Sequence, residues 1–107
     1  MSSIAVVEAP VPSLVAPFRL TSDHRLDFRR ASLEALAAAA QAGEPAVSID
    51  LTRTIELDAS GLGVLVLLQK RARERGLRTR LVNPARAVRE MLQLTRLDSL
   101  FELVTLE

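Results

Sequence analysis

The segment Leu57–Leu65, with the sequence LDASGLGVL, has the residue types and spacing most suggestive of chemistry. A carboxylate and a hydroxyl stand beside two glycines, Gly61 and Gly63, and an apolar run follows. Glycine-rich loops that hold phosphate groups need a third glycine, as in G-x-G-x-x-G, or a lysine and a hydroxyl residue after the last glycine, as in a P-loop. Here the next lysine is Lys70, and Val66 stands where the third glycine would be. The segment therefore argues against a nucleotide site of either kind.

The carboxylates Asp50, Glu56 and Asp58 could instead form an acid–base set. Such catalysis needs a positioned substrate and usually a nucleophile or a metal ion beside the carboxylates. The chain has no cysteine and one histidine, His24, which excludes a cysteine nucleophile, a thiolate metal site and a histidine-rich metal site. A turn or a helix cap accounts for each carboxylate. We therefore predict no catalytic residue, no metal and no cofactor, and a protein that is not an enzyme.

Asp58 is well suited to begin a helix, which we predict to run to about Arg75. An aspartate before the first turn accepts a backbone N–H of that turn, and its charge suits the positive end of the helix dipole. Glycine inside a helix costs up to about 1 kcal/mol relative to alanine. Gly61 and Gly63 therefore indicate the close approach of another backbone, which is either the protein's own sheet or a docked partner.

The first two turns of this helix are apolar nearly all round, whereas its second half, QKRARER, is amphiphilic. A helix that lies on a sheet buries one side only. Leu62, Leu65 and Val66 share one face, so some of the other apolar residues are expected to face a partner, namely Val64, Leu67 and Leu68. The basic residues from Lys70 to Arg80 are expected to be solvated, with contact to an acidic partner as the alternative.

The remaining sequence predicts the elements that position this helix. The 107 residues suit one α/β domain with an aliphatic core and a largely parallel sheet, because strands alternate with helices from residue 45 onward. A run of strong helix formers predicts a helix at Arg29–Ala42, and Asn83 followed by Pro84 is typical of a helix start. Asp98 is suited to cap a short last turn. Strands are expected at Pro45–Leu51, Ile55–Leu57, Leu77–Val82 and Glu102–Leu106.

The first part of the chain predicts additional strands. Prolines at 10, 12 and 17 indicate a loop or a sheet edge, and Ile4–Val7 is expected as an edge strand. Phe18–Leu20 and Arg25–Phe28 are predicted to form a second extended pair, joined by a polar corner and antiparallel. The predicted fold is thus a mixed sheet covered by about four helices.

Charge is close to balance, with 14 basic against 13 acidic residues, and tryptophan and tyrosine are absent. Neither a nucleic acid nor an anionic membrane surface is expected as a main partner. The longest apolar run, Leu62–Leu68, is far shorter than the ~20 residues that span a bilayer. The first residues do not resemble a signal peptide. We expect a cytoplasmic protein without direct membrane insertion.

The order of these motifs resembles the STAS domain, which bacterial anti-sigma factor antagonists and sulfate transporters share. The resemblance rests on D-x-S-G-L-G-V-L, which begins at Asp58, on the strand end IDL before it, and on the LVNP and LTRLDSLF segments after it. Leu26 and Asp27 are similar to the end of the family's Gly-x-Leu-Asp segment, with His24 in place of the glycine. The match covers about residues 18–106, which implies an N-terminal extension at 1–17 and a STAS domain at 18–107.

The resemblance implies a protein-interaction module in a partner-switching system that regulates transcription. In that family the antagonist binds an anti-sigma factor that is also a serine kinase, and phosphorylation of the residue after the aspartate releases it. Here that residue is Ala59, which has no hydroxyl. Ser60 is one position further on, and successive helical positions point about 100° apart. We therefore predict no phosphorylation at this motif, with use of Ser60 as the alternative.

The residues predicted to contact the partner lie at the start of this helix and in the upstream segment: Asp27, Asp58, Ser60, Gly61, Gly63, Val64, Leu67 and Leu68. Two other hypotheses keep the fold and change the partner. One is a STAS subunit that contacts the ATPase of a lipid-transporting ABC complex, and the other is a sensor of a small molecule such as a nucleotide or a lipid. A homodimer also stays open.

Overall fold

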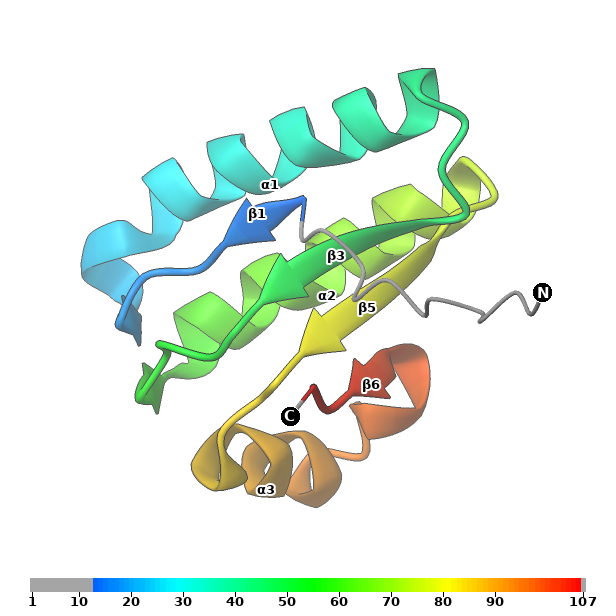
Figure 1. Ribbon diagram of the computed structural model, residues 1–107. Helices are drawn as coiled ribbons and strands as arrows, with labels where there is room; N and C mark the ends of the chain where they lie inside the picture. Colours follow the sequence, from blue (N-terminus) through cyan, green and yellow to red (C-terminus); the bar gives the residue numbers. More distant parts are fainter. Residues whose placement is uncertain (1–12, 107) are drawn as a thin grey trace, which may run out of the picture.

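The computed structural model describes residues 13–106 and arranges them as a parallel sheet with helices against it (Figure 1). The strand order in the main sheet is β1-β3-β5-β6, and a separate parallel ladder pairs β2 with β4. In chain order the elements are β1 (Leu14–Val15), β2 (Arg19–Leu20), the 3-10 turn η1 (Ser22–His24), α1 (Arg25–Gln41), β3 (Ala46–Asp50), β4 (Glu56–Leu57), α2 (Ala59–Glu74), β5 (Arg78–Val82), α3 (Arg86–Leu94), the 3-10 turn η2 (Asp98–Leu100) and β6 (Glu102–Val104).

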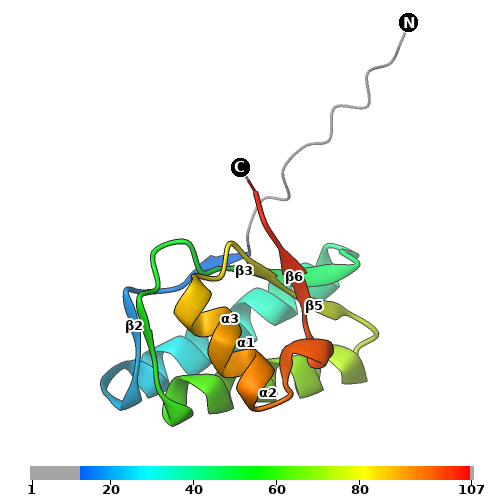
Figure 2. The ribbon, with the colours of Figure 1, turned by 90° about the horizontal axis from the view of Figure 1, so that it is seen from below.

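Helices α1 and α2 lie side by side against one face of the sheet (Figures 1 and 2). The core between these layers is aliphatic, as the composition predicts: Ile49 of β3, Leu81 of β5, and Leu65 and Leu68 of α2 are each 0% exposed. Four of the five residues of β3 are buried, which is typical of a central strand in a parallel sheet. Helix α3 packs beside β4 and η2 at one end of the molecule.

The predicted α/β fold is confirmed in its second half. Strands β3, β4, β5 and β6 lie inside the ranges predicted for them, and α2 begins and ends within a residue of the prediction. Asp98 begins a 3-10 turn rather than an α-helical one. Among residues 13–106, the predicted four helices become three α-helices and two 3-10 turns.

The prediction of an antiparallel pair near the N-terminus is wrong. Arg19–Leu20 is a strand, but it pairs in parallel with Glu56–Leu57. Arg25–Phe28 is the first turn of α1, which η1 connects to the strand. The physical reason is that Phe28 is buried at a helical spacing from Ser32 and Leu36, which are also buried, so α1 begins four residues earlier than predicted. The predicted strand Ile4–Val7 lies outside the described residues.

The prediction that Asn83 caps a helix is also wrong. Helix α3 begins at Arg86, and Asn83 has a φ of 52°, in the left-handed region that asparagine tolerates better than most residues. Its side-chain Nδ2 donates to Thr52 Oγ1 at 3.1 Å, and its Oδ1 accepts from the N–H of Leu106 at 2.6 Å. The amide thus connects the loop after β3 to the end of the chain, which precludes the capping role.

Candidate functional site

The start of α2 is held by Asp58, as the sequence predicts. The residue is extended, with φ −107° and ψ −176°, and its Oδ1 accepts from the N–H of Gly61 at 2.9 Å. Its Oδ2 accepts from the N–H of Ser22 at 3.1 Å, so the same carboxylate also fixes η1 next to α2. The carboxylate therefore fixes the position of η1, which leads into α1, relative to the first turn of α2.

These hydrogen bonds lower the pKa of Asp58 below its ordinary value of 3.8. The N–H of Gly61 is the largest cause, partial desolvation opposes it, and the N–H groups of Ser22 and Ser60 lower the pKa further. Hydrogen bonds from N–H groups favour the charged form of a carboxylate, which explains the direction.

This lowered pKa predicts an acid-dependent contribution to stability. A carboxylate whose pKa is lower in the folded state stabilises the fold fully above its unfolded-state pKa, and this contribution is lost as pH falls through the folded-state pKa. We expect the unfolding temperature of the wild type to approach that of Asp58→Asn as pH falls below about 4, since asparagine caps helices without titrating. Thermal unfolding followed by circular dichroism between pH 7 and pH 2.5 measures this. A gap between the two proteins that is the same at pH 7 and at pH 2.5 would contradict the linkage.

The two glycines of α2 have different surroundings. A Cβ at Gly61 would overlap the backbone carbonyl oxygen of Leu20 and lie 2.8 Å from the carbonyl carbon. Gly61 is therefore required by the close approach of the protein's own strand β2. A Cβ at Gly63 would meet nothing within 4 Å, and this residue is exposed. The described chain gives no packing reason for a glycine there.

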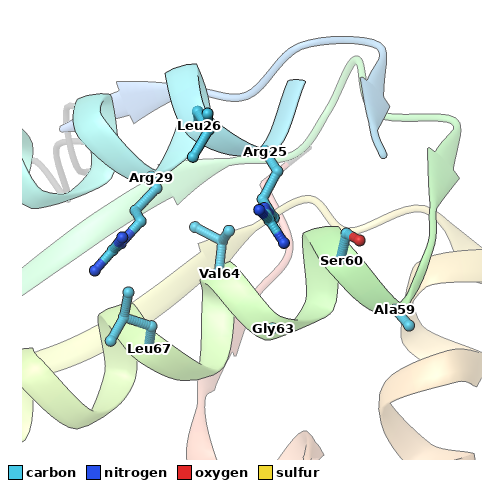
Figure 3. Close-up of a pocket in the computed structure, with 8 residues that line it drawn as sticks. All are labelled: Arg25, Leu26, Arg29, Ala59, Ser60, Gly63, Val64 and Leu67. Carbon is cyan, nitrogen blue, oxygen red and sulfur yellow. The ribbon is translucent and has the colours of Figure 1, made fainter. Parts of the chain in front are cut away.

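Gly63 lies in a groove between α1 and α2, with a volume of about 450 Å³ (Figure 3). We refer to it as the α1–α2 groove, and it is lined by Arg25, Leu26, Arg29, Ala59, Ser60, Gly63, Val64 and Leu67. Leu26 is 65% exposed, whereas Val64 is 4% exposed and forms part of the floor. The groove thus combines apolar surface with two arginines.

Five predicted partner-contact residues lie in or beside this groove. Ser60, Gly63, Val64 and Leu67 line it, and Asp58 begins the helix that forms one wall. The lining residues of α2 share one side of the helix because they are spaced by three or four residues, and this side faces α1 across the groove (Figure 3).

The other three predicted contact residues need correction. Leu68 is 0% exposed and packs in the core, and buried Gly61 contacts β2, so neither is available to a partner in this conformation. Asp27 belongs to α1 rather than to a loop, and it lines a separate hollow of about 210 Å³ with His24 and Phe28. Asp27 is two positions from both Arg25 and Arg29, which turns it about 200° away around the helix.

Three groove residues were not predicted from the sequence: Arg25, Leu26 and Arg29. The sequence predicts an extended segment at Arg25–Phe28, and such a segment gives Arg25 no fixed position relative to Arg29. The signal that could have found them is the four-residue spacing of the two arginines, which brings side chains together on one helix face.

Family comparison agrees with this arrangement of elements. A family model described as "Mlab, STAS domain" matches residues 15–105, which is most of the chain. The chain belongs to the STAS domain family. No curated protein matches it.

This STAS domain is also similar to solved structures. A candidate anti-sigma factor antagonist of Thermotoga maritima, TM1081, is 23% identical with a TM-score of 0.71, and the match covers 88% of this chain and 80% of that one. The unphosphorylated form of the anti-sigma factor antagonist SpoIIAA is 19% identical with a TM-score of 0.69, covering 88% of this chain and 78% of that one. At these identities the similarity establishes a shared fold.

Across residues 13–106, no helix combines the length and the apolar character needed to cross a bilayer. Within the same residues, histidine, cysteine, aspartate and glutamate side chains do not gather in groups of three or more that could hold a metal ion.

Proposed function

We propose that this STAS domain is a non-enzymatic protein-interaction module that binds an anti-sigma factor of the serine-kinase type through the α1–α2 groove. The observation that carries the proposal is the environment of Gly63. An exposed glycine inside a helix costs up to about 1 kcal/mol relative to alanine, and open space surrounds the Cβ position. A partner backbone that approaches α2 at this point explains why no side chain is present.

The surroundings of Gly63 support docking of a protein. Leu26 is 65% exposed at the rim, and the half-buried side chain of Leu67 adds apolar surface beside it, above the buried Val64 of the floor. Buried apolar anchors with a polar rim are typical of protein interfaces. The similarity to TM1081 and SpoIIAA, which are described as anti-sigma factor antagonists, supports this class of partner.

We further propose that binding is not switched by phosphate at the start of α2. Ala59 occupies the position of the family's phosphoacceptor, is exposed, and presents a methyl group that points away from the arginines of the groove (Figure 3). A phosphate would add nearly two negative charges, and release of a partner by 100-fold requires about 2.7 kcal/mol. Without a hydroxyl at this position the protein stays in the binding state.

The test is incubation with the anti-sigma factor kinase of the same cell and ATP, followed by pull-down and intact mass measurement. We expect a stable complex, an unchanged mass for the wild type, and one added phosphate on Ala59→Ser, since this variant restores the hydroxyl. Ala59→Val is the matched control, which changes the side chain without adding an acceptor. One phosphate on Ser60 of the wild type would contradict the absence of a switch, and no complex would contradict the choice of partner.

A second candidate function keeps the groove and changes the partner. The matching family model is described as "Mlab, STAS domain" and names no anti-sigma factor, so we retain as a second candidate a STAS subunit that contacts the ATPase of a lipid-transporting ABC complex. Co-purification from native cells, with the bound protein identified by mass spectrometry, separates the two. Recovery of a transporter ATPase without an anti-sigma factor would establish the second candidate.

A further inference from the structure

Within residues 13–106, the two arginines of the α1–α2 groove form no ion pair with an acidic side chain. Arg25 and Arg29 are both exposed and one helical turn apart, and Figure 3 shows Arg25 reaching from α1 toward Ser60 and Val64, with Arg29 reaching toward Leu67. The ion pairs found within residues 13–106 involve other arginines: Arg19 with Glu56, Arg78 and Arg80 with Glu102, and Arg86 with Glu90. The groove therefore presents two guanidinium groups to solvent.

This placement is unfavourable for the helices themselves. Arg25 is the first residue of α1, where the positive end of the helix dipole disfavours a cation. The positive end of α2 lies next to it, because Arg25 and Ala59 line the same groove. Like charges four residues apart, as in Arg25 and Arg29, also weaken a helix.

Among the described residues, the acidic groups nearby form no ion pair with Arg25 or Arg29. Asp58 already accepts N–H groups of Gly61 and Ser22, and Asp27 lies on the opposite side of α1. Asp23 lies in η1, outside the groove lining. Within residues 13–106 the two guanidinium groups therefore form no ion pair, and they lie over a floor that includes buried Val64.

We propose that the α1–α2 groove receives a helical segment of the partner protein in which two carboxylates flank one apolar side chain. The carboxylates pair with the guanidinium groups of Arg25 and Arg29, and the apolar side chain lies beside Gly63 against Leu67. Arginine suits this role because its planar guanidinium can bind a carboxylate through two parallel hydrogen bonds. This inference rests on the proposed function, to which it adds the chemistry of the partner.

The first test uses a defined probe and the full chain. A short helical peptide with a leucine between two glutamates one turn apart is titrated into isotopically labelled protein, beside a peptide with lysines in place of the glutamates. We expect the glutamate peptide to shift the amide signals of Arg25, Arg29 and Gly63, less so as salt increases, because exposed charges are screened. Equal shifts by both peptides, or shifts confined to other surfaces, would overturn the inference.

The second test uses the purified protein identified by co-purification. We expect Arg25→Glu/Arg29→Glu to bind at least about 30-fold more weakly, with a slower and less salt-dependent association. Arg71→Glu/Arg75→Glu is the matched control, since it makes the same charge change in the hollow at the other end of α1 and α2; it should stay within about 3-fold of the wild type. Equal losses in both variants would overturn the inference, because net charge would then explain them.

The variants also separate this inference from the proposed function. If Arg25→Glu/Arg29→Glu binds like the wild type while Gly63→Trp does not bind, acidic recognition is wrong and the groove remains the binding surface. If Gly63→Trp also binds like the wild type, the partner does not bind in the α1–α2 groove, and the proposed function is contradicted. Loss of fold is checked by the unfolding temperature, which we expect not to fall, because glutamate at the start of α1 suits the helix dipole.

Discussion

Gly61→Ala should destabilise the protein by about 2–4 kcal/mol, whereas Gly63→Ala should stabilise it by about 0.5–1 kcal/mol. The same substitution two residues apart in one helix changes sign because of what each Cβ meets. At Gly61 the methyl overlaps the carbonyl of Leu20, so β2 must move away from α2. At Gly63 the methyl meets nothing within 4 Å, and the gain is the higher helix propensity of alanine.

Thermal and urea unfolding of the two variants beside the wild type measures this difference. For a domain of this size each 1 kcal/mol corresponds to roughly 4–8 °C in unfolding temperature. The two alanine variants act as each other's control, because both lose a glycine from the same helix. If Gly61→Ala is as stable as the wild type, β2 can move away from α2 at little cost, which contradicts the first expectation. If Gly63→Ala is less stable, its methyl group meets a neighbouring atom, which contradicts the second.

Gly63→Trp should reduce binding of the partner by at least about 100-fold, which corresponds to about 2.7 kcal/mol, and leave the fold intact. An indole at this position fills the α1–α2 groove and keeps a partner backbone away from α2. The fold should tolerate it, since the position is exposed and open. Isothermal titration calorimetry with the co-purified protein measures the loss.

The matched control for this variant is Arg73→Trp. Arg73 is exposed on the same helix but lines a different hollow, beside Leu77 and Phe101. We expect this variant to bind like the wild type. Equal loss of binding in both variants would indicate a general effect of tryptophan on α2, and unchanged binding by Gly63→Trp would move the interface elsewhere.

Together the glycine variants separate the two meanings that glycine has in this motif. Gly61 is explained by a contact inside the domain, whereas we propose that Gly63 is explained by a contact with another protein. Glycine inside a helix lowers the stability of the helix relative to alanine, so a specific cause is expected for each of the two glycines. The motif therefore combines a folding requirement at Gly61 and the proposed docking position at Gly63 within one turn of α2.

Local physical chemistry in the sequence determined much of the secondary structure of this protein. The N-cap at Asp58, the long helix after it, the buried strand at Ala46–Asp50 and the strand at Arg78–Val82 follow from capping preference, helix propensity and runs of apolar residues. These signals act over a few residues, so they can be read without tertiary contacts. The family resemblance also lies in such segments, and the lack of a hydroxyl at Ala59, on which the proposed absence of a switch rests, is visible in the sequence alone.

Only the tertiary structure decided the features that depend on contacts between distant segments. The carbonyl of Leu20 lies against Gly61 and not against Gly63, so the two glycines have different causes. The burial of Phe28 makes Arg25–Phe28 helical, and this places Arg25 and Arg29 in the lining of the groove. Burial of Leu68 removes it from the predicted surface. Each outcome depends on which residues pack together across the chain, and local preference is too weak to determine that when tertiary burial opposes it.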